Sequence, residues 1–254
     1  MKLVTFNIRC ADCQDGGNSF RFRKPLILEK LRREEPDVIC FQEVLPYVAV
    51  WLKESLEGYY VVGCPRSAEL EDEQVAVAYR RDRLNLISME TFWLSETPLV
   101  PGSRYPGQSV CPRTGTEVLL EDLRERRVFR LTNVHLDHEG AGARDRGLQQ
   151  ILCKSRANAL LPDGPAMSGG DMNAEPDAPE MAALKTAPYV NLTAGTGATY
   201  HGYGQADPPV SIDYILTQGF RCGKIERWTE ERDGVYLSDH YPVCAELRFE
   251  EGAS

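Results

Sequence analysis

The sequence predicts a layered α/β or α+β fold, and three observations support this. Runs with strand character recur along the 254 residues, and amphipathic helical patterns fall between them. Hydrophobic residues make up 42% and charged residues 26%, which is typical of a globular chain and excludes a disordered or fibrous one. No repeat or low-complexity segment divides the chain, so we expect one domain over residues 1–254.

The first half of the chain is predicted to begin with a strand and a helix. Residues 2–8 form an apolar run of strand character. Residues 22–34 place Leu26 and Leu31 on one face of a helix, and Pro36 ends that helix. Two further strands are expected, at residues 37–41 and 74–80.

The second half repeats this alternation. A strand is expected at residues 127–135, followed by a helix at residues 143–161 that carries Leu148 and Ile151 on one face. The last two strands are expected at residues 211–217 and 241–249. Two long segments rich in Gly and Pro, 97–116 and 193–209, are predicted to be loops that form a pocket wall, because loops this long are usually functional.

The charge balance limits the partners. The chain has 29 basic and 38 acidic residues and a net charge of −9, so it lacks the broad positive field that drives non-specific binding to duplex nucleic acid. Apolar runs are far shorter than the ~20 residues of a membrane span. The N-terminus turns polar too early for a signal peptide. We expect a cytoplasmic protein without membrane contact or an obligate protein partner.

The eight cysteines are scattered along the chain. Without a secretory signal, we interpret them as reduced and mostly buried thiols. Cys10 and Cys13 form a single CxxC, and because no second pair accompanies it, we favour a structural role over a metal or redox role.

Polar or acidic residues follow directly on several apolar strand runs. Functional side chains gather where strands emerge onto loops held by a rigid scaffold. Aspartate, glutamate and histidine in such settings indicate a site for a metal ion and a phosphate. The residues placed in this way are Glu43, His135, Asp171, Asn173, Asp213, Asp239 and His240.

Six of these segments resemble the endonuclease/exonuclease/phosphatase superfamily in order and spacing, over nearly the whole chain. They are TFN at 5–7, FQEV at 41–44, NVHL at 133–136, GDMN at 170–173, IDYI at 212–215 and SDHYP at 238–242. FWLSETP at 92–98, PR at 112–113 and GDMNAEP at 170–176 are most similar to the bacterial branch related to nocturnin-like deadenylases. The resemblance implies a four-layer sandwich of two central, mostly antiparallel sheets packed face to face, with helices outside.

The resemblance also implies a metal site. Glu43 is the leading ligand candidate, with Asp239 and the amide of Asn7 near it. Mg²⁺, or Mn²⁺ in its place, is the expected cofactor, because hard cations prefer oxygen ligands.

For the chemistry, the resemblance assigns Asp171 to orient or deprotonate the attacking water and Asn173 to hold the phosphate or Asp171. His240 would contact a phosphate oxygen while Asp213 accepts a hydrogen bond from its other ring nitrogen. The sequence leaves open whether Asp171 or His240 takes the proton of the water.

Three further residues complete the expected site. His135 is the second histidine expected to contact the phosphate, and Glu73 is its expected partner, although Glu71 or Asp72 could take that place. Arg113 is expected to bind a substrate phosphate through its bidentate fork.

These residues predict a divalent-metal-dependent hydrolase of phosphoester bonds. The branch resemblance favours a phosphodiesterase or nuclease that shortens single-stranded RNA from its 3′ end. An alternative is a phosphatase or phosphodiesterase for a small molecule, such as a sugar phosphate, a nucleotide or a lipid headgroup. An inactive binding scaffold is an alternative of another class, but it requires an essential residue to be missing, and all are present. Substrate, cleavage polarity, metal number and oligomeric state stay open.

Overall fold

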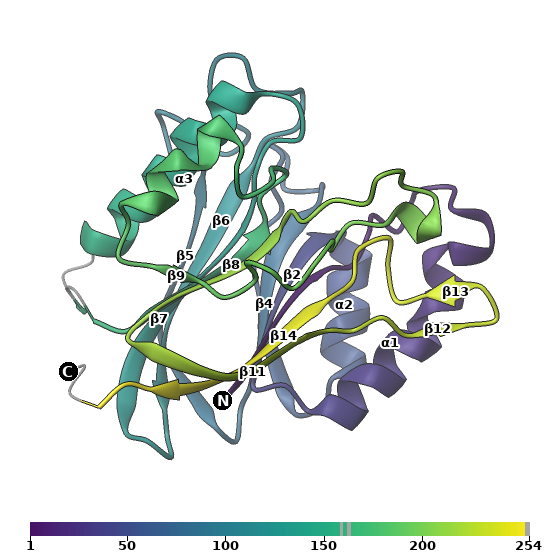
Figure 1. Ribbon diagram of the computed structural model, residues 1–254, viewed down its shortest axis with the longest axis horizontal. Coiled ribbons are helices and arrows are strands. Elements are labelled where there is room, and N and C mark those ends of the chain that lie inside the picture. Colours follow the sequence, from purple (N-terminus) through teal and green to yellow (C-terminus); the bar gives the residue numbers. More distant parts are fainter. Residues whose placement is uncertain (158–159, 162–163, 252–254) are drawn as a thin grey trace.

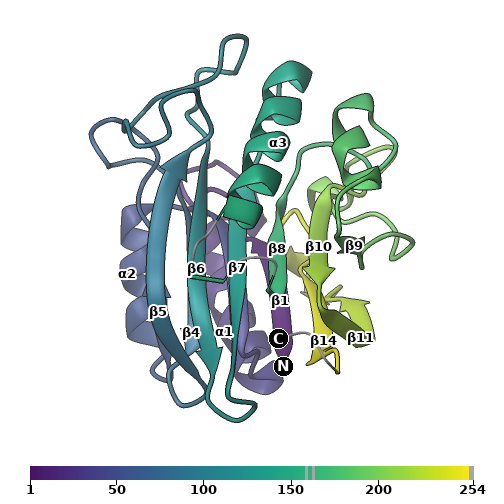
Figure 2. The same cartoon turned by 90° about the vertical axis from the view of Figure 1, so that its left-hand side faces the viewer.

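The computed structural model describes residues 1–157, 160–161 and 164–251 and arranges them in four layers (Figure 1). Helix α3 (Ala141–Ala157) covers one six-stranded sheet, and a second six-stranded sheet packs behind it. Helices α1 (Phe20–Glu34) and α2 (Pro46–Ser55) cover the outer face of the second sheet, and Figure 2, which looks onto the first sheet, shows both helices behind the strands. This is the four-layer sandwich that the family resemblance implied, and the layered α/β class predicted from the sequence pattern is consistent with it.

The sheet under α1 and α2 has the order β11-β14-β1-β2-β4-β3. β1 and β2 run parallel, and the other neighbours are antiparallel. Its strands are β1 (Lys2–Asn7), β2 (Val38–Val44), β3 (Tyr59–Val62), β4 (Gln74–Arg80), β11 (Phe220–Arg227) and β14 (Val243–Phe249).

The sheet under α3 has the order β5-β6-β7-β8-β10-β9, with only β7 and β8 parallel. A small hairpin and three short 3₁₀ helices complete the described elements. The strands are β5 (Leu84–Trp93), β6 (Thr114–Asp122), β7 (Arg127–His135), β8 (Ala166–Asp171), β9 (Val190–Asn191) and β10 (Asp213–Gln218). The hairpin is β12 (Glu231–Arg232) with β13 (Val235–Tyr236), and the 3₁₀ helices are η1 (Gly16–Asn18), η2 (Pro179–Lys185) and η3 (Gly202–Gly204).

Three apolar clusters fill the three spaces between the four layers. In β2 the side chains alternate, so that Ile39 and Phe41 pack with the cluster under α1 and α2 while Val38 and Cys40 pack between the sheets. A third cluster, which includes Leu148, joins α3 to its sheet. Because both faces of each sheet are covered, the central strands are almost continuously buried.

The expected helix at residues 143–161 corresponds to α3, which begins two residues earlier; positions 158–159 lie outside the described residues, and residues 160–161 are not helical. Within the described ranges, none of the helices has the length and apolar character to cross a membrane.

Candidate functional site

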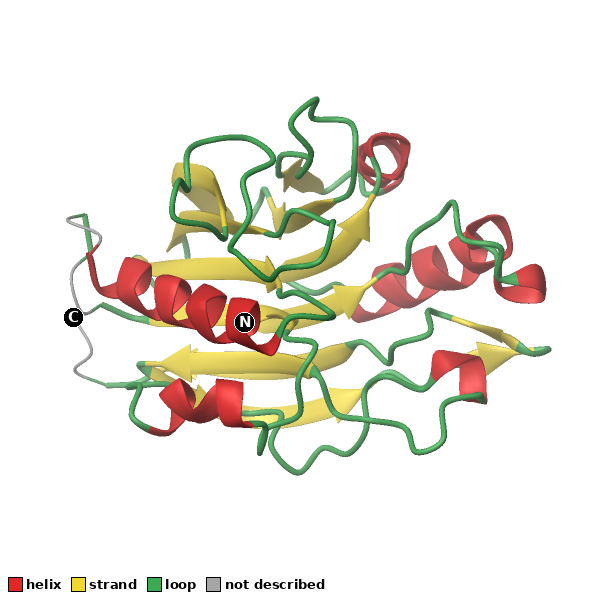
Figure 3. Cartoon of the chain, turned by 90° about the horizontal axis from the view of Figure 1, so that it is seen from above, coloured by secondary structure: helices red, strands yellow, loops and turns green. Residues whose placement is uncertain are grey.

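The two pairs of parallel strands bring the predicted residues to one edge of the sandwich. Asn7 ends β1, His135 ends β7 and Asp171 ends β8. Asp213 opens β10 and lies directly opposite Asp171 in the strand register. Figure 3 looks from above, where loops cross over the strand ends. The loop before β14 adds the remaining two predicted residues of this edge, Asp239 and His240.

A β-bulge turns Glu43 into the site. The pairing of β2 with β4 shifts between Phe41 and Val44, and Glu43 has a φ of 61° in the left-handed region. A bulge re-aims the side chain that it carries, which regular alternation would direct toward the helices. Glu43 Oε2 accepts the backbone N–H of Cys10 at 2.6 Å.

Asn7 connects two carboxylates. Its Nδ2 donates to Glu43 Oε1 at 2.9 Å and to Asp171 Oδ2 at 3.0 Å, while its Oδ1 accepts the backbone N–H of Arg9 at 3.0 Å. This orientation follows from the chemistry, because a backbone N–H only donates and a carboxylate only accepts. The amide nitrogen of Asn7 therefore faces the carboxylates, and its role as a metal ligand stays a prediction.

His240 lies between two buried carboxylates. Its Nδ1 is 2.8 Å from Asp213 Oδ2 and its Nε2 is 3.8 Å from Asp171 Oδ2. Burial alone would lower the pKa of His240, but Asp213 and Asp171 outweigh it and raise this pKa to about 10. Burial and the nearby charge of Asp213 raise the pKa of Asp171 above its ordinary value. The imidazolium form is thus stabilised beside a carboxyl group that binds a proton readily.

Asn173 holds the other oxygen of Asp171. Its backbone N–H donates to Asp171 Oδ1 at 2.8 Å, and its Nδ2 donates to the carbonyl oxygen of Leu136 at 3.0 Å. Asn173 itself has a φ of 49°. The turn after β8 therefore fixes the carboxylate of Asp171 from one side and leaves Oδ2 toward the histidines.

His135 contacts Asp171 and not Glu73. His135 Nε2 lies 3.5 Å from Asp171 Oδ2, whereas the Glu73 carboxylate forms an ion pair with Arg66 at 2.8 Å. Asp72 also binds Arg66, at 2.9 Å. The expected pairing of Glu73 with His135 is therefore not what the structure shows. Burial and the charges of Arg113 and Arg66 lower the pKa of His135, so the neutral ring competes poorly with a guanidinium for a carboxylate.

A cleft of about 420 Å³ contains these groups. It brings Glu43, Asp171, Asp239, His135 and His240 together in one space. Its remaining walls include Arg9, Cys10, Cys13, Arg66, Glu73, Cys111, Arg113, His138, Asn173, Tyr200 and Ile212. Asp213 lies beneath His240, to which it is hydrogen-bonded.

The donor set fits a hard divalent cation. Burial raises the pKa of Asp239, and the charge of Glu43 raises it further, so the two carboxylates repel one another in the cleft. A cation between them relieves this repulsion. Asp171, Asp213 and His240 also bring three potential ligand atoms within 4.8 Å of one another. In this second group, however, His240 is already hydrogen-bonded to Asp213. This favours Glu43 and Asp239 as the metal ligands instead.

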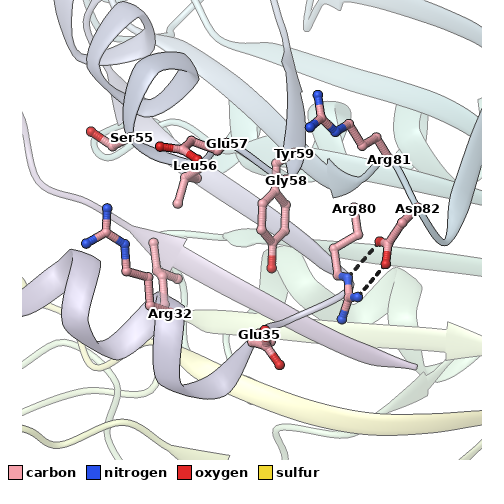
Figure 4. A pocket seen from close by; sticks show the side chains of 11 residues that line it. Arg32, Glu35, Ser55, Leu56, Glu57, Gly58, Tyr59, Arg80, Arg81 and Asp82 are labelled. Carbon is pink, nitrogen blue, oxygen red and sulfur yellow. Dashed lines mark hydrogen bonds and ion pairs between the residues drawn. The ribbon is translucent and has the colours of Figure 1, made fainter.

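A larger groove, of about 650 Å³, lies where α1, α2 and β4 end (Figure 4). Arg80 and Asp82 lie side by side in its wall and pair at 2.7 Å, and Arg32 and Arg81 also line it. The groove contains none of the predicted catalytic or metal-binding residues. Size alone therefore does not identify the site.

A buried Asp–His–Asp cluster beside crowded carboxylates, at one edge of a four-layer sandwich, defines the class of metal-dependent phosphoester hydrolases. The model of the endonuclease/exonuclease/phosphatase family matches residues 4–240. The chain belongs to this family and is a phosphoester hydrolase; the family depends on divalent metal ions.

Solved structures agree with this assignment. An endonuclease/exonuclease/phosphatase from Bacteroides vulgatus is 27% identical, with a TM-score of 0.91 and 98% of each chain covered. A mannosyl-6-phosphatase of Bacteroides thetaiotaomicron is 24% identical, with a TM-score of 0.86, over 98% of this chain and all of the other. The catalytic domain of human nocturnin shares the fold at 19% identity, with a TM-score of 0.74 and coverage of 98% and 94%. No curated protein matches the sequence.

The sequence analysis missed Arg66. The side chain of Arg66 is mostly buried and held between Asp72 and Glu73, and its carbonyl oxygen accepts the indole N–H of Trp93 at 2.6 Å. No motif surrounds it in the sequence, and its position depends on the fold of the loop before β4. Only the structure shows that it lines the same cleft as Arg113.

Proposed function

We propose that this protein hydrolyses the phosphate ester of a small molecule with a divalent cation and a buried acid–base cluster. The observation that carries the proposal is the cleft of about 420 Å³, in which Glu43, Asp171, His135 and His240 meet. A cleft of this size takes a molecule such as a sugar phosphate or a mononucleotide. The net charge of −9 gives no attraction to a long polyanion.

Asp171 is the proposed base for the attacking water. Burial raises its pKa, which makes the carboxylate a better proton acceptor near neutral pH. Hydrogen bonds from Asn173 and Asn7 hold both of its oxygens in place. This arrangement supports Asp171 over His240 as the proton acceptor, because the raised pKa of His240 keeps that ring protonated.

The histidines are proposed to hold the phosphate. Protonated His240, oriented by Asp213, donates from Nε2 to a phosphate oxygen and stabilises the charge that develops during attack. His135 is the second contact and uses a neutral ring. Arg113 provides positive charge on the wall beside His135.

Glu43 and Asp239, with Asn7 beside them, are the proposed ligands for Mg²⁺ or Mn²⁺. A bound cation neutralises phosphate oxygens and so supplies electrophilic assistance to the reaction. The chain's own contribution is to hold Glu43, through the backbone of Cys10 and the amide of Asn7, so that its carboxylate faces the cleft.

A second candidate is the 3′→5′ exonucleolytic shortening of single-stranded RNA. Tyr200 favours it, because this ring lines the cleft with its centroid 5.0 Å from that of His240. An aromatic side chain in this position offers a face on which a terminal base stacks. The fold shared with nocturnin is compatible with this candidate.

A substrate panel with Mg²⁺ or Mn²⁺ distinguishes the two candidates. Sugar phosphates and mononucleotides are assayed for phosphate release, beside a 5′-labelled oligoadenylate, with Asp171→Asn as the matched blank. We expect chelator-sensitive hydrolysis of a small ester, absent in the blank. A ladder that shortens from the 3′ end, without small-ester hydrolysis, would instead establish the second candidate. If the protein hydrolyses none of these compounds, both candidate functions are contradicted.

A further inference from the structure

Arg113 is buried in the cleft wall and held along one edge. Its side chain is 5% exposed, and its Nη2 lies 2.8 Å from Nδ1 of His138. Its Nε is 3.7 Å from Asp137 Oδ1, beyond hydrogen-bond distance. Asp137 is itself occupied by Ser109 and by the backbone N–H of Gly140. The guanidinium is therefore positioned by its neighbours without being neutralised at close range.

Two nitrogens of this guanidinium lack a hydrogen-bond partner. Among the described residues, Nε and Nη1 of Arg113 are both without one, although both are shielded from solvent. A buried donor without a partner costs free energy, and a charged one costs more than a neutral one. Such a group marks a place where a ligand atom completes the hydrogen bonding.

The surroundings of Arg113 show that the missing partner is an anion. Arg113 and Arg66 line the same narrow extension of the cleft, with His135 and Glu43 also in its wall. Burial and the repulsion from Arg66 lower the pKa of Arg113, while Glu73 and Asp171 act in the opposite direction. Glu73 is already paired with Arg66. An oxyanion placed beside His135 would therefore meet a preorganised cation whose Nε and Nη1 lack hydrogen-bond partners.

We propose that Arg113 selects phosphomonoesters, by binding the terminal phosphate oxygen that a phosphodiester lacks. This inference rests on the proposed function and names its substrate class. A monoester carries three terminal oxygens and up to two negative charges. A diester carries two terminal oxygens and one charge, and its second ester group would bring a carbon substituent against the donor of Arg113. A site built around a hydrogen bond discriminates strongly against the analogue that cannot form it.

The reaction is the hydrolysis of R–O–PO₃²⁻ by water to R–OH and HPO₄²⁻. The oxygen of water forms a new bond to phosphorus, and the bond between phosphorus and the ester oxygen breaks. One proton of the water reaches the leaving oxygen and the other remains on the phosphate. The product is inorganic phosphate, so the same Arg113 contact also binds the product.

The test compares p-nitrophenyl phosphate with bis(p-nitrophenyl) phosphate in the metal-loaded protein. We expect the unaltered protein to prefer the monoester and Arg113→Met to lower the ratio of the two kcat/KM values about 100-fold. Arg113→Lys, which keeps the charge and loses the fork, should give an intermediate ratio. Arg124→Met, on an exposed turn far from the cleft, is the matched control and should keep the ratio.

Binding of inorganic phosphate, measured by calorimetry on folded variants, gives a readout other than activity. Phosphate should bind the unaltered protein and the Arg124→Met variant. It should bind the Arg113→Met variant at least about 10-fold more weakly. An unchanged substrate ratio, or equal phosphate binding, in a folded Arg113→Met variant overturns the inference alone. If the unaltered protein hydrolyses neither probe and no ester of the substrate panel, the proposed function is contradicted instead.

Discussion

Asp171, Asp213 and His240 show how position changes the chemistry of ordinary side chains. Each is at most 5% exposed, and the two carboxylates flank the imidazole. In water, two aspartates and a histidine would titrate independently. Here, the histidine retains its proton because the carboxylates stabilise the cation, and Asp171 acquires a raised pKa because burial penalises its charge.

The pair of His240 and Asp213 should therefore act as one unit. Either single variant, His240→Ala or Asp213→Ala, removes the oriented imidazolium and should lower kcat by about 10²- to 10⁴-fold. The double variant should be scarcely worse than either single variant. Steady-state kinetics on all four proteins measures this, and fully additive losses would show that the 2.8 Å contact does not couple them functionally.

Asp137 should make stability depend on pH. Burial alone would raise its pKa, but hydrogen bonds from Ser109 and Gly140 outweigh this and lower it. A carboxylate with a lowered folded-state pKa contributes stability above its unfolded pKa of about 3.9, and the contribution is lost as the pH falls through the folded value.

Asp137→Asn should accordingly lower the free energy of unfolding at pH 7 by about 1–3 kcal/mol. The difference from the unaltered protein should shrink below about pH 4, because the unaltered side chain also becomes neutral there. Urea unfolding at pH 7 and pH 3.5 measures it. A difference that stays constant between the two pH values would rule out this role of the Asp137 charge.

At the scale of elements, the two sheets must approach closely below the site. A Cβ built on Gly169 of β8 would lie 3.1 Å from Cys40 Sγ and 3.3 Å from Cys40 Cβ, on β2 in the opposite sheet. Beside this contact, Asn133 Nδ2 donates to the carbonyl oxygens of Phe41 and Ala76, each at 2.8 Å. The absence of a side chain at Gly169 allows the sheets to approach, and the hydrogen bonds of Asn133 hold them together.

Gly169→Val should therefore destabilise the fold by about 1–3 kcal/mol through overpacking. Cys40→Ala in the same chain should recover part of this loss, because it removes the sulfur nearest to the new side chain. Urea unfolding of the two single variants and the double variant measures the coupling. If Cys40→Ala gives no recovery, the inter-sheet contact is not what restricts this position.

Elements with a strong local pattern could be predicted from the sequence, and others could not. β4 matches its predicted range because its apolar run is continuous and buried, and β7 matches because it is rich in β-branched and aromatic residues and mostly buried. β5 was missed because it is an edge strand in which buried and exposed residues alternate irregularly. α2 was missed because the apolar run Val48–Leu52 is uninterrupted and hides the helical spacing of its buried residues Val48, Ala49 and Leu52. Motif residues such as Glu43 could be placed, whereas the partner of Glu73 depends on how a loop folds onto the sheet.

At the scale of the whole molecule, the fold needs no covalent support. A chain of 254 residues buries three apolar clusters between four layers, and all eight cysteines are free thiols. A domain of this size has enough buried surface to be stable without disulfides.

A reductant should therefore change neither the mass nor the activity of the protein. Thiol titration of the denatured, unreduced chain should give eight reactive groups, one for each free cysteine. Mass spectrometry before and after reduction provides the control. A gain of about two daltons on reduction, or a titre of six, would show a disulfide and contradict this description.

The proposed function requires a metal-dependent cleft in which Glu43 would be a ligand. The most direct measurement is calorimetric titration with Mn²⁺, together with the rate of ester hydrolysis and the melting temperature, for the unaltered protein and Glu43→Gln. We expect the variant to lose Mn²⁺ affinity and hydrolysis while its melting temperature stays unchanged or rises, since Glu43 repels Asp239 in the cleft. A folded Glu43→Gln protein that binds Mn²⁺ and hydrolyses esters as before would contradict the account.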